Sequence, residues 1–113
     1  MFDKNVEMVL LRAAREAQER AHEYLVLEHL LLAILENEEG AEVLENCGAD
    51  IDELRKQIGR FLDTNIETFL NRGGVQPQQT LAFQRVLQRA ILHVKYSSKD
   101  AVGVGDLLAA IFT

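Results

Sequence analysis

The chain has 113 residues, of which 48% are hydrophobic and 27% are charged, and its formal net charge at pH 7 is −6. This composition is typical of one globular domain with a single core and excludes a disordered chain. The negative charge argues against nucleic-acid partners, and no apolar run is long enough to cross a membrane, so we predict a cytoplasmic protein.

The first predicted helix covers residues 3–21, and Asp3 is its expected N-cap. Apolar residues recur along it with the spacing of one helix face, which predicts a buried stripe. These residues are Val6, Val9, Leu10, Ala13, Ala14 and Ala17. On the opposite face, Glu16 and Arg20 lie one turn apart and are expected to form an ion pair.

After a connector over residues 22–26, a second helix is predicted over residues 27–37. Its run from Leu30 to Leu35 is apolar on all sides, which indicates a central, buried helix. Gly40 is expected to separate it from a short third helix over residues 41–47. Cys47 is expected to be a small buried residue, and Gly48 a left-handed C-cap. A single cysteine cannot form an intramolecular disulfide, so nothing indicates an oxidising compartment.

A fourth helix is predicted from Asp50, which has the capping-box spacing to Glu53. Its apolar side consists of Ile51, Leu54, Ile58, Phe61 and Leu62. Helix-breaking residues then follow, and we interpret residues 63–79 as a linker. The breakers are Asn71, Arg72, Gly73, Gly74 and Pro77.

The fifth helix is predicted over residues 81–97 with Thr80 as its N-cap, and the sixth over residues 106–112. The buried stripe of the fifth helix is Phe83, Val86, Leu87, Ala90, Ile91 and Val94. Leu92 is expected to face the core as well, with the amphipathic His93 beside it. The apolar residues of the sixth helix are expected to be partly exposed or covered by a partner chain. They are Leu107, Leu108, Ile111 and Phe112.

An internal repeat relates the two ends of the chain. When residues 2–36 are placed over residues 79–113 without a gap, the apolar positions coincide, as for Val9 with Val86. We therefore predict an all-α fold, with one domain over residues 1–113 that consists of two pseudo-repeats. The first repeat covers residues 2–62, and a second repeat, residues 80–113, stops before its last two helices. The chain is expected to be a piece of a larger protein.

No catalytic or metal site and no cofactor are predicted. Residues 73–74 are not followed by the lysine of a phosphate-binding loop. His22 and His29 are seven residues apart across a connector, so we interpret them as surface or capping histidines and not as a metal pair. Ser97 and Ser98 have no evident base beside them. The chain itself is therefore expected not to be an enzyme.

The duplicated helical unit and the stretch EHLLLAIL at residues 28–35 resemble the N-terminal domain of Clp ATPases, which are AAA+ unfoldases. Residues 79–90, QTLAFQRVLQRA, are most similar to the ClpA branch. The resemblance extends over the chain from residue 2. It implies a domain that receives substrates and adaptors and hydrolyses no ATP. In the ClpA branch this domain binds the adaptor ClpS, and the whole ATPase delivers substrates to the ClpP peptidase.

The resemblance also implies which residues contact the adaptor. These are Glu23, Glu28, Thr80, Gln84 and Arg85. A patch of mixed charge suits a transient, electrostatically steered interface. Two of the residues have a simpler interpretation, because an acid such as Glu28 favours a helix N-terminus and Thr80 is a helix cap.

Two other functions stay open. The ClpB branch, a disaggregase, has the same fold and captures unfolded polypeptide directly, which would use an apolar groove and depend little on Glu23 or Glu28. A self-associating structural domain would instead pair through its apolar C-terminal helix. In the ClpC branch a Thr-Glu-His motif in both repeats binds phosphorylated arginine. Here residues 27–29 read Leu-Glu-His and residues 104–106 read Val-Gly-Asp, so a twofold phosphoarginine site is not expected.

Overall fold

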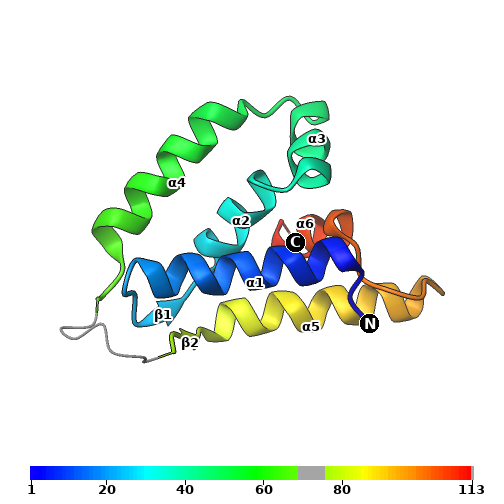
Figure 1. The fold of residues 1–113 in the computed structure, drawn as a ribbon. Coiled ribbons are helices and arrows are strands. Elements are labelled where there is room, and N and C mark those ends of the chain that lie inside the picture. Colours follow the sequence, from blue (N-terminus) through cyan, green and yellow to red (C-terminus); the bar gives the residue numbers. More distant parts are fainter. Residues whose placement is uncertain (69–75, 113) are drawn as a thin grey trace.

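The computed structural model describes residues 1–68 and 76–112. This part of the chain is mostly helical, as predicted, and it also contains two strands of two residues each (Figure 1). The elements are α1 (Lys4–Glu19), β1 (Tyr24–Leu25), α2 (Leu27–Leu35), α3 (Glu38–Asn46), α4 (Ile51–Asn65), β2 (Gln78–Gln79), α5 (Leu81–Tyr96) and α6 (Val104–Ile111). Helix α2 packs against α1, α3 and α4, while α6 packs against α5 and α3. None of the described helices is long and apolar enough to span a membrane.

Three helices begin at the N-caps that the sequence predicts. Asp3, Asp50 and Thr80 each accept a hydrogen bond from the backbone N–H three residues further on, at 2.9, 3.2 and 3.3 Å. Each bond satisfies one of the N–H groups that a helix start leaves without an intrahelical partner. Gly48 has a φ of +91°, which confirms the predicted left-handed position after α3.

Two helix starts differ from the prediction. Helix α3 begins at Glu38, because the Asn37 side chain accepts the Gly40 N–H at 3.0 Å and caps the helix earlier. Gly40 therefore lies inside α3 and does not separate two helices. Helix α6 begins at Val104 and not at Asp106, because the Asp106 carboxylate caps it from the third helical position.

The predicted linker contains more secondary structure than expected. Helix α4 continues to Asn65, and Ile66 packs against the core. Strand β2 then forms at the end of the same segment. The predicted breakers at residues 71–74 lie outside the described residues.

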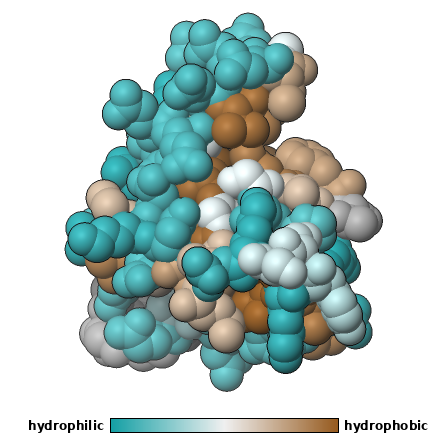
Figure 2. Space-filling model, turned by 90° about the vertical axis from the view of Figure 1, so that its right-hand side faces the viewer, coloured by the Kyte–Doolittle hydropathy of each residue, from teal (hydrophilic) through white to brown (hydrophobic). Residues whose placement is uncertain are grey.

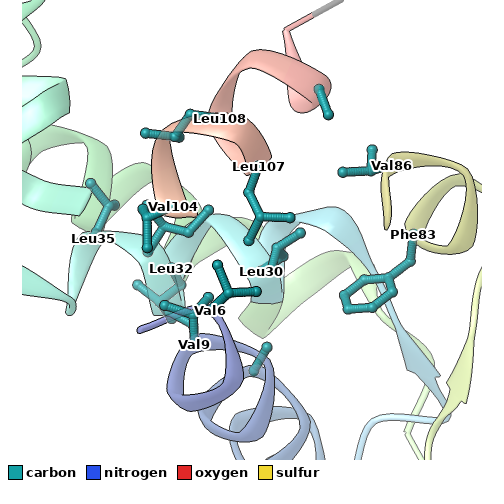
Figure 3. Close-up of a cluster of buried hydrophobic side chains, with 14 of the residues drawn as sticks. Val6, Val9, Leu30, Leu32, Leu35, Phe83, Val86, Val104, Leu107 and Leu108 are labelled. Carbon is teal, nitrogen blue, oxygen red and sulfur yellow. The ribbon is translucent and has the colours of Figure 1, made fainter. Parts of the chain in front are cut away.

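One hydrophobic core includes residues of both predicted pseudo-repeats, and the predicted stripes of α1 and α5 are buried in it or packed against it. Positions 77 residues apart are buried together. Such pairs are Val6 and Phe83, Val9 and Val86, Ala13 and Ala90, Ala17 and Val94, Leu25 and Val102, and Leu30 and Leu107. Figure 3 shows Val6 of α1 and Leu30 of α2 directed toward Leu107 of α6. The core is thus built across the repeats and not within each one.

The two repeats also exchange backbone hydrogen bonds. Strand β1 pairs in parallel with β2, and the Thr80 N–H donates to the Leu25 carbonyl at 3.1 Å. At the other end of the molecule Phe2 forms a parallel bridge with Val102, and the Asp3 N–H donates to the Val102 carbonyl at 3.0 Å. Thr80 and Val102 lie 77 residues after Asp3 and Leu25. The first helix of each repeat is therefore held at its start by the other repeat.

The second helix of each repeat is capped from its third residue. The Val26 N–H donates to His29 Nδ1 at 3.0 Å, and the Gly103 N–H donates to Asp106 Oδ2 at 2.9 Å. His29 and Asp106 are again 77 residues apart. Burial alone would raise the pKa of Asp106, but the Gly103 N–H and the Lys99 ammonium, 3.1 Å away, lower it overall.

His22 and His29 are buried, so their interpretation as surface residues is wrong, although His29 does act as a cap. His22 Nδ1 and His29 Nε2 are 2.8 Å apart. Because His29 Nδ1 accepts the Val26 N–H, its Nε2 carries the proton and donates to His22. The other nitrogen of His22 donates to the Leu62 carbonyl. Burial lowers the pKa of both histidines, that of His29 to about 4.

The structure also corrects other predictions of which side chains are buried or exposed. Cys47 is exposed, because the C-cap of α3 lies beyond the part of the helix that faces the core. Leu92 is exposed because it lies outside the buried stripe of α5. Leu107 and Leu108 are buried, since α3 and α5 cover α6. Phe112 is 69% exposed, as expected. Figure 2 views the end of the molecule with α3 and α6, where hydrophobic surface lies between hydrophilic side chains.

Gly40→Ala should destabilise the fold. A Cβ atom at Gly40 would lie 2.4 Å from the carbonyl oxygen of Ile34 and 2.6 Å from its Cγ2, so α2 and α3 would have to separate. We expect a loss of about 1–3 kcal/mol in the free energy of unfolding, measured by urea denaturation. The matched control is Gly59→Ala in α4, where a Cβ would meet nothing within 4 Å. The free energy of unfolding of this control should rise by about 0.5–1 kcal/mol, because alanine favours a helix more than glycine does. Equal effects of the two substitutions would contradict this packing.

Acid should destabilise the protein through the histidine pair. Above pH 6.5 His29 is neutral in the folded and unfolded chain, and its stabilising contribution is complete. As the pH falls from 6.5 to about 4, the unfolded chain binds the proton first, so the free energy of unfolding decreases. We expect a loss on the order of 2 kcal/mol from this group, measured by urea denaturation across that range.

His29→Asn is the test of this assignment, because its amide oxygen keeps an acceptor for the Val26 N–H, as Asp106 does for Gly103. The pH dependence of this variant should be shallower than that of the parent chain. An unaltered slope in His29→Asn would refute the role of the pair.

Candidate functional site

The residues with a predicted adaptor role lie around the junction of β1 and β2, at the end of the molecule where α1 ends and α5 begins (Figure 1). Glu23 directly precedes β1 and is half-buried. Its N–H donates to the Glu67 carbonyl at 2.8 Å, and its carbonyl accepts the Gln78 N–H at 2.9 Å. The backbone of Glu23 is therefore fixed on both sides.

Thr80 is half-buried and does two structural tasks. Its Oγ1 accepts the Phe83 N–H at 3.3 Å and donates to the Leu25 carbonyl at 3.3 Å. The predicted helix cap is thus confirmed, and the same hydroxyl joins α5 to β1. Its place in an adaptor contact stays a prediction.

Gln84 and Arg85 are exposed near the start of α5. Their neighbours Phe83 and Val86 are buried, so the helix directs Gln84 and Arg85 away from the core. Arg85 forms no ion pair with any described residue. Its guanidinium is therefore available to a partner carboxylate.

Glu28 is half-buried in the first turn of α2. It has no hydrogen bond or ion pair with the described residues, because His29 supplies the side-chain cap of this helix. The positive end of the helix dipole favours the carboxylate there. In the second repeat Gly105 takes the matching place in α6, so only the first repeat carries this charge.

The histidine pair fixes the segment that carries both glutamates. His22 precedes Glu23 and His29 follows Glu28, so their bond of 2.8 Å closes the connector into a loop. Next to His22, Arg20 pairs with Glu16 at 2.6 Å, which confirms that predicted pair. Burial works against the charge of Arg20, but its carboxylate partners raise its pKa overall.

Two apolar residues of this surface were missed by the sequence analysis. Tyr24 is 40% exposed and Leu81 is 60% exposed, and they directly follow Glu23 and Thr80. The alternation of exposed Tyr24 with buried Leu25 is a strand signal, but a strand of two residues is too short to be recognised by its pattern.

The arrangement suits binding and not covalent chemistry. It combines two carboxylates, one free guanidinium, an amide and two apolar side chains, without a nucleophile held beside a base. Within residues 1–68 and 76–112, no group of three or more His, Cys, Asp or Glu side chains could hold a metal ion.

Comparison with known proteins gives the family. The family described as the Clp repeat (R) N-terminal domain matches residues 1–113. A ClpA homolog protein of Fuscovulum blasticum is 37% identical over 112 residues, which are 98% of this chain and 14% of that protein. The chloroplastic chaperone protein ClpC1 of Arabidopsis thaliana is 41% identical over 75 residues, which are 65% of this chain and 8% of that protein.

Solved structures share the fold. The Hsp104 N-terminal domain from Candida albicans has a TM-score of 0.85 at 17% identity and covers 97% of this chain and 72% of its own. The N-domain of ClpV, solved with a VipB peptide, has a TM-score of 0.81 at 22% identity and covers 96% of this chain and 66% of its own. The chain thus spans a small part of its full-length relatives and most of the solved N-terminal domains. The chain belongs to the Clp repeat (R) N-terminal domain family, which forms the N-terminal domain of Clp ATPases.

Proposed function

We propose that this domain recognises adaptors and substrates for a ClpA-like unfoldase, and that it docks a ClpS-type adaptor at the β-junction surface. We define this surface as Glu23, Tyr24, Glu28, Thr80, Leu81, Gln84 and Arg85. The observation that carries the proposal is the exposure of Tyr24 and Leu81 among free charged groups of both signs.

This composition is that of a small protein interface. An exposed aromatic and an exposed leucine provide an apolar centre that gains free energy on leaving water. Glu28 and Arg85 have no ionic partners among the described residues, so a partner can pair with them without breaking an existing bond. Charges at the rim steer the encounter and select the orientation of the partner.

The comparisons support a protein-binding role in general. The solved complex of the ClpV N-domain contains a VipB peptide, so this fold binds a peptide in that protein. For this chain we infer docking without chemistry, in which a bound adaptor raises the local concentration of its substrate near the ATPase. Delivery to a ClpP-type peptidase, a cytoplasmic location and the division into repeats over residues 2–62 and 80–113 stay predictions.

The test is a calorimetric titration of a purified ClpS-type adaptor into the parent chain and into a Glu23→Lys/Glu28→Lys variant. We expect saturable binding by the parent chain. The variant should bind at least about tenfold more weakly, because two attractive contacts become repulsive. Reversal of Glu28 also opposes the dipole of α2 and costs about 0.3–1 kcal/mol, so thermal melting must show that the variant is folded.

The matched control is Glu42→Lys/Glu45→Lys, which makes the same change in charge on the exposed side of α3. It should bind the adaptor as the parent does. A folded parent chain that does not bind the adaptor would refute the proposal, as would equal losses in both variants. Binding of unfolded polypeptide with no dependence on Glu23 and Glu28 would favour the direct-capture alternative.

A further inference from the structure

A second surface, separate from the β-junction surface, lies along α1. Met8, Leu11, Arg12 and Arg15 have the i, i+3, i+4, i+7 spacing of a single helix stripe. All four are exposed, Met8 at 64% and Leu11 at 61%. We call this set the α1 stripe. It combines apolar and cationic side chains in a chain whose net charge is −6.

The α1 stripe borders a groove between α1 and α2. One pocket of about 210 Å³ is lined by Met8, Leu11 and Arg15, and a neighbouring pocket of about 250 Å³ extends to Gly59 of α4. Both pockets share Arg12, Ala33 and Glu36 in their walls, so they lie side by side, and we call the two together the groove. Small residues at Ala33 and Gly59 leave room that larger side chains would fill.

The arginines at the α4 end of the groove are already neutralised. Arg20 pairs with Glu16 at 2.6 Å and also with Asp63. Arg55 pairs with Glu36 at 3.0 Å and, further out, with an aspartate of its own helix. This part of the groove therefore offers little net charge to a ligand.

The cations of the α1 stripe are different. Arg15 has no ion pair with any described residue, and Arg12 pairs with Glu36 at 3.7 Å, a carboxylate that Arg55 engages more closely at 3.0 Å. In the second repeat the residue that matches Arg12 is Arg89, which donates to the Ala110 carbonyl at 2.9 Å. Arg15, a cation without an ionic partner among the described residues, thus lies on the same stripe as the exposed Met8 and Leu11.

We propose that the α1 stripe and its groove dock an acidic, amphipathic peptide segment of a partner protein. An apolar side chain of the segment packs between Met8 and Leu11, and its carboxylates pair with Arg12 and Arg15. The stripe is about 10 Å long, which matches two turns of a helix on the partner. Charge complementarity selects the acidic segment, because a basic one would be repelled by the two arginines.

This surface is distinct from the one proposed for the adaptor. Met8 lies near the start of α1, and about 16 Å of helix separates it from the end of α1, where β1 follows. Figure 1 shows the start of α1 and the β1–β2 junction at opposite ends of the molecule. The apolar end of the α1 stripe, at Met8 and Leu11, therefore lies far from the β-junction surface, and Arg15 lies one helical turn before the end of α1.

The experiment uses two fluorescein-labelled peptides of 14 residues and measures their fluorescence anisotropy with the whole chain. The first has leucines at i, i+3 and i+4 spacing on a background of Glu and Asp, and the second has Lys at every acidic position. We expect saturable binding of the acidic peptide that weakens when the salt is raised to roughly 0.5 M, and no binding of the basic one. Equal binding of both peptides, or preference for the basic one, would overturn the proposal.

Variants then locate the surface. Arg12→Glu/Arg15→Glu should lower the affinity for the acidic peptide about tenfold. The neutral substitutions Arg12→Gln/Arg15→Gln should also lower this affinity. Lys56→Glu/Arg60→Glu makes the same change in charge on the exposed face of α4 and should leave affinity within about twofold. An equal loss in that control would show a general charge effect and would overturn the proposal.

Two further measurements separate this inference from the proposed function. Glu23→Lys/Glu28→Lys should bind the acidic peptide with the affinity of the parent chain, and Arg12→Glu/Arg15→Glu should bind the adaptor with the affinity of the parent chain. Leu11→Ser should weaken the peptide without changing the salt dependence, because it removes apolar contact only. A dimer in sedimentation that Leu11→Ser abolishes would show that a second copy covers the stripe, and would overturn the proposal.

Discussion

The reciprocal exchange of backbone hydrogen bonds between the two repeats is the constraint on which the rest of the structure depends. The Asp3 N–H requires the Val102 carbonyl, and the Thr80 N–H requires the Leu25 carbonyl. Neither repeat can satisfy these groups alone, and an unpaired backbone N–H in a buried position is unfavourable. The shared core makes each repeat depend on the other in the same way, because Val6 and Leu30 of the first repeat pack toward Leu107 of the second (Figure 3).

This exchange also creates the candidate site. The β1–β2 pairing brings residues 23–25 next to residues 78–80, which are more than 50 positions away in the sequence. Glu23 and Tyr24 thereby become neighbours of Gln78, and Leu25 becomes a neighbour of Thr80. The matching junction at the other end, between Phe2 and Val102, lies near the start of α1 and its exposed stripe. Each proposed surface thus adjoins a place where the two predicted repeats pair through their backbones.

Matching backbone positions in the two repeats carry side chains of different chemistry. The caps of α2 and α6 occupy the same position, but one is the neutral His29 in a buried pair and the other is the ionised Asp106 beside Lys99. Glu28 has no counterpart at Gly105, and Arg12 pairs with the Glu36 carboxylate where Arg89 is bound to a carbonyl. Equivalent backbone geometry requires only that the hydrogen bonds be made, so the side chains that make them, and those on the outer faces, are free to diverge.

The sequence by itself determined the helices, their caps at Asp3, Asp50 and Thr80, and the buried stripes, because caps and helical periodicity are local properties. It also determined the family, through motifs in residues 28–35 and 79–90. Only the tertiary structure decided the rest. Strands of two residues have no local signal, the His22–His29 pair depends on how a connector closes, and Leu107 is buried by helices distant in sequence. The exposed Tyr24, Leu81 and Met8 became visible for the same reason, since exposure is decided by what packs against a residue and not by the residue itself.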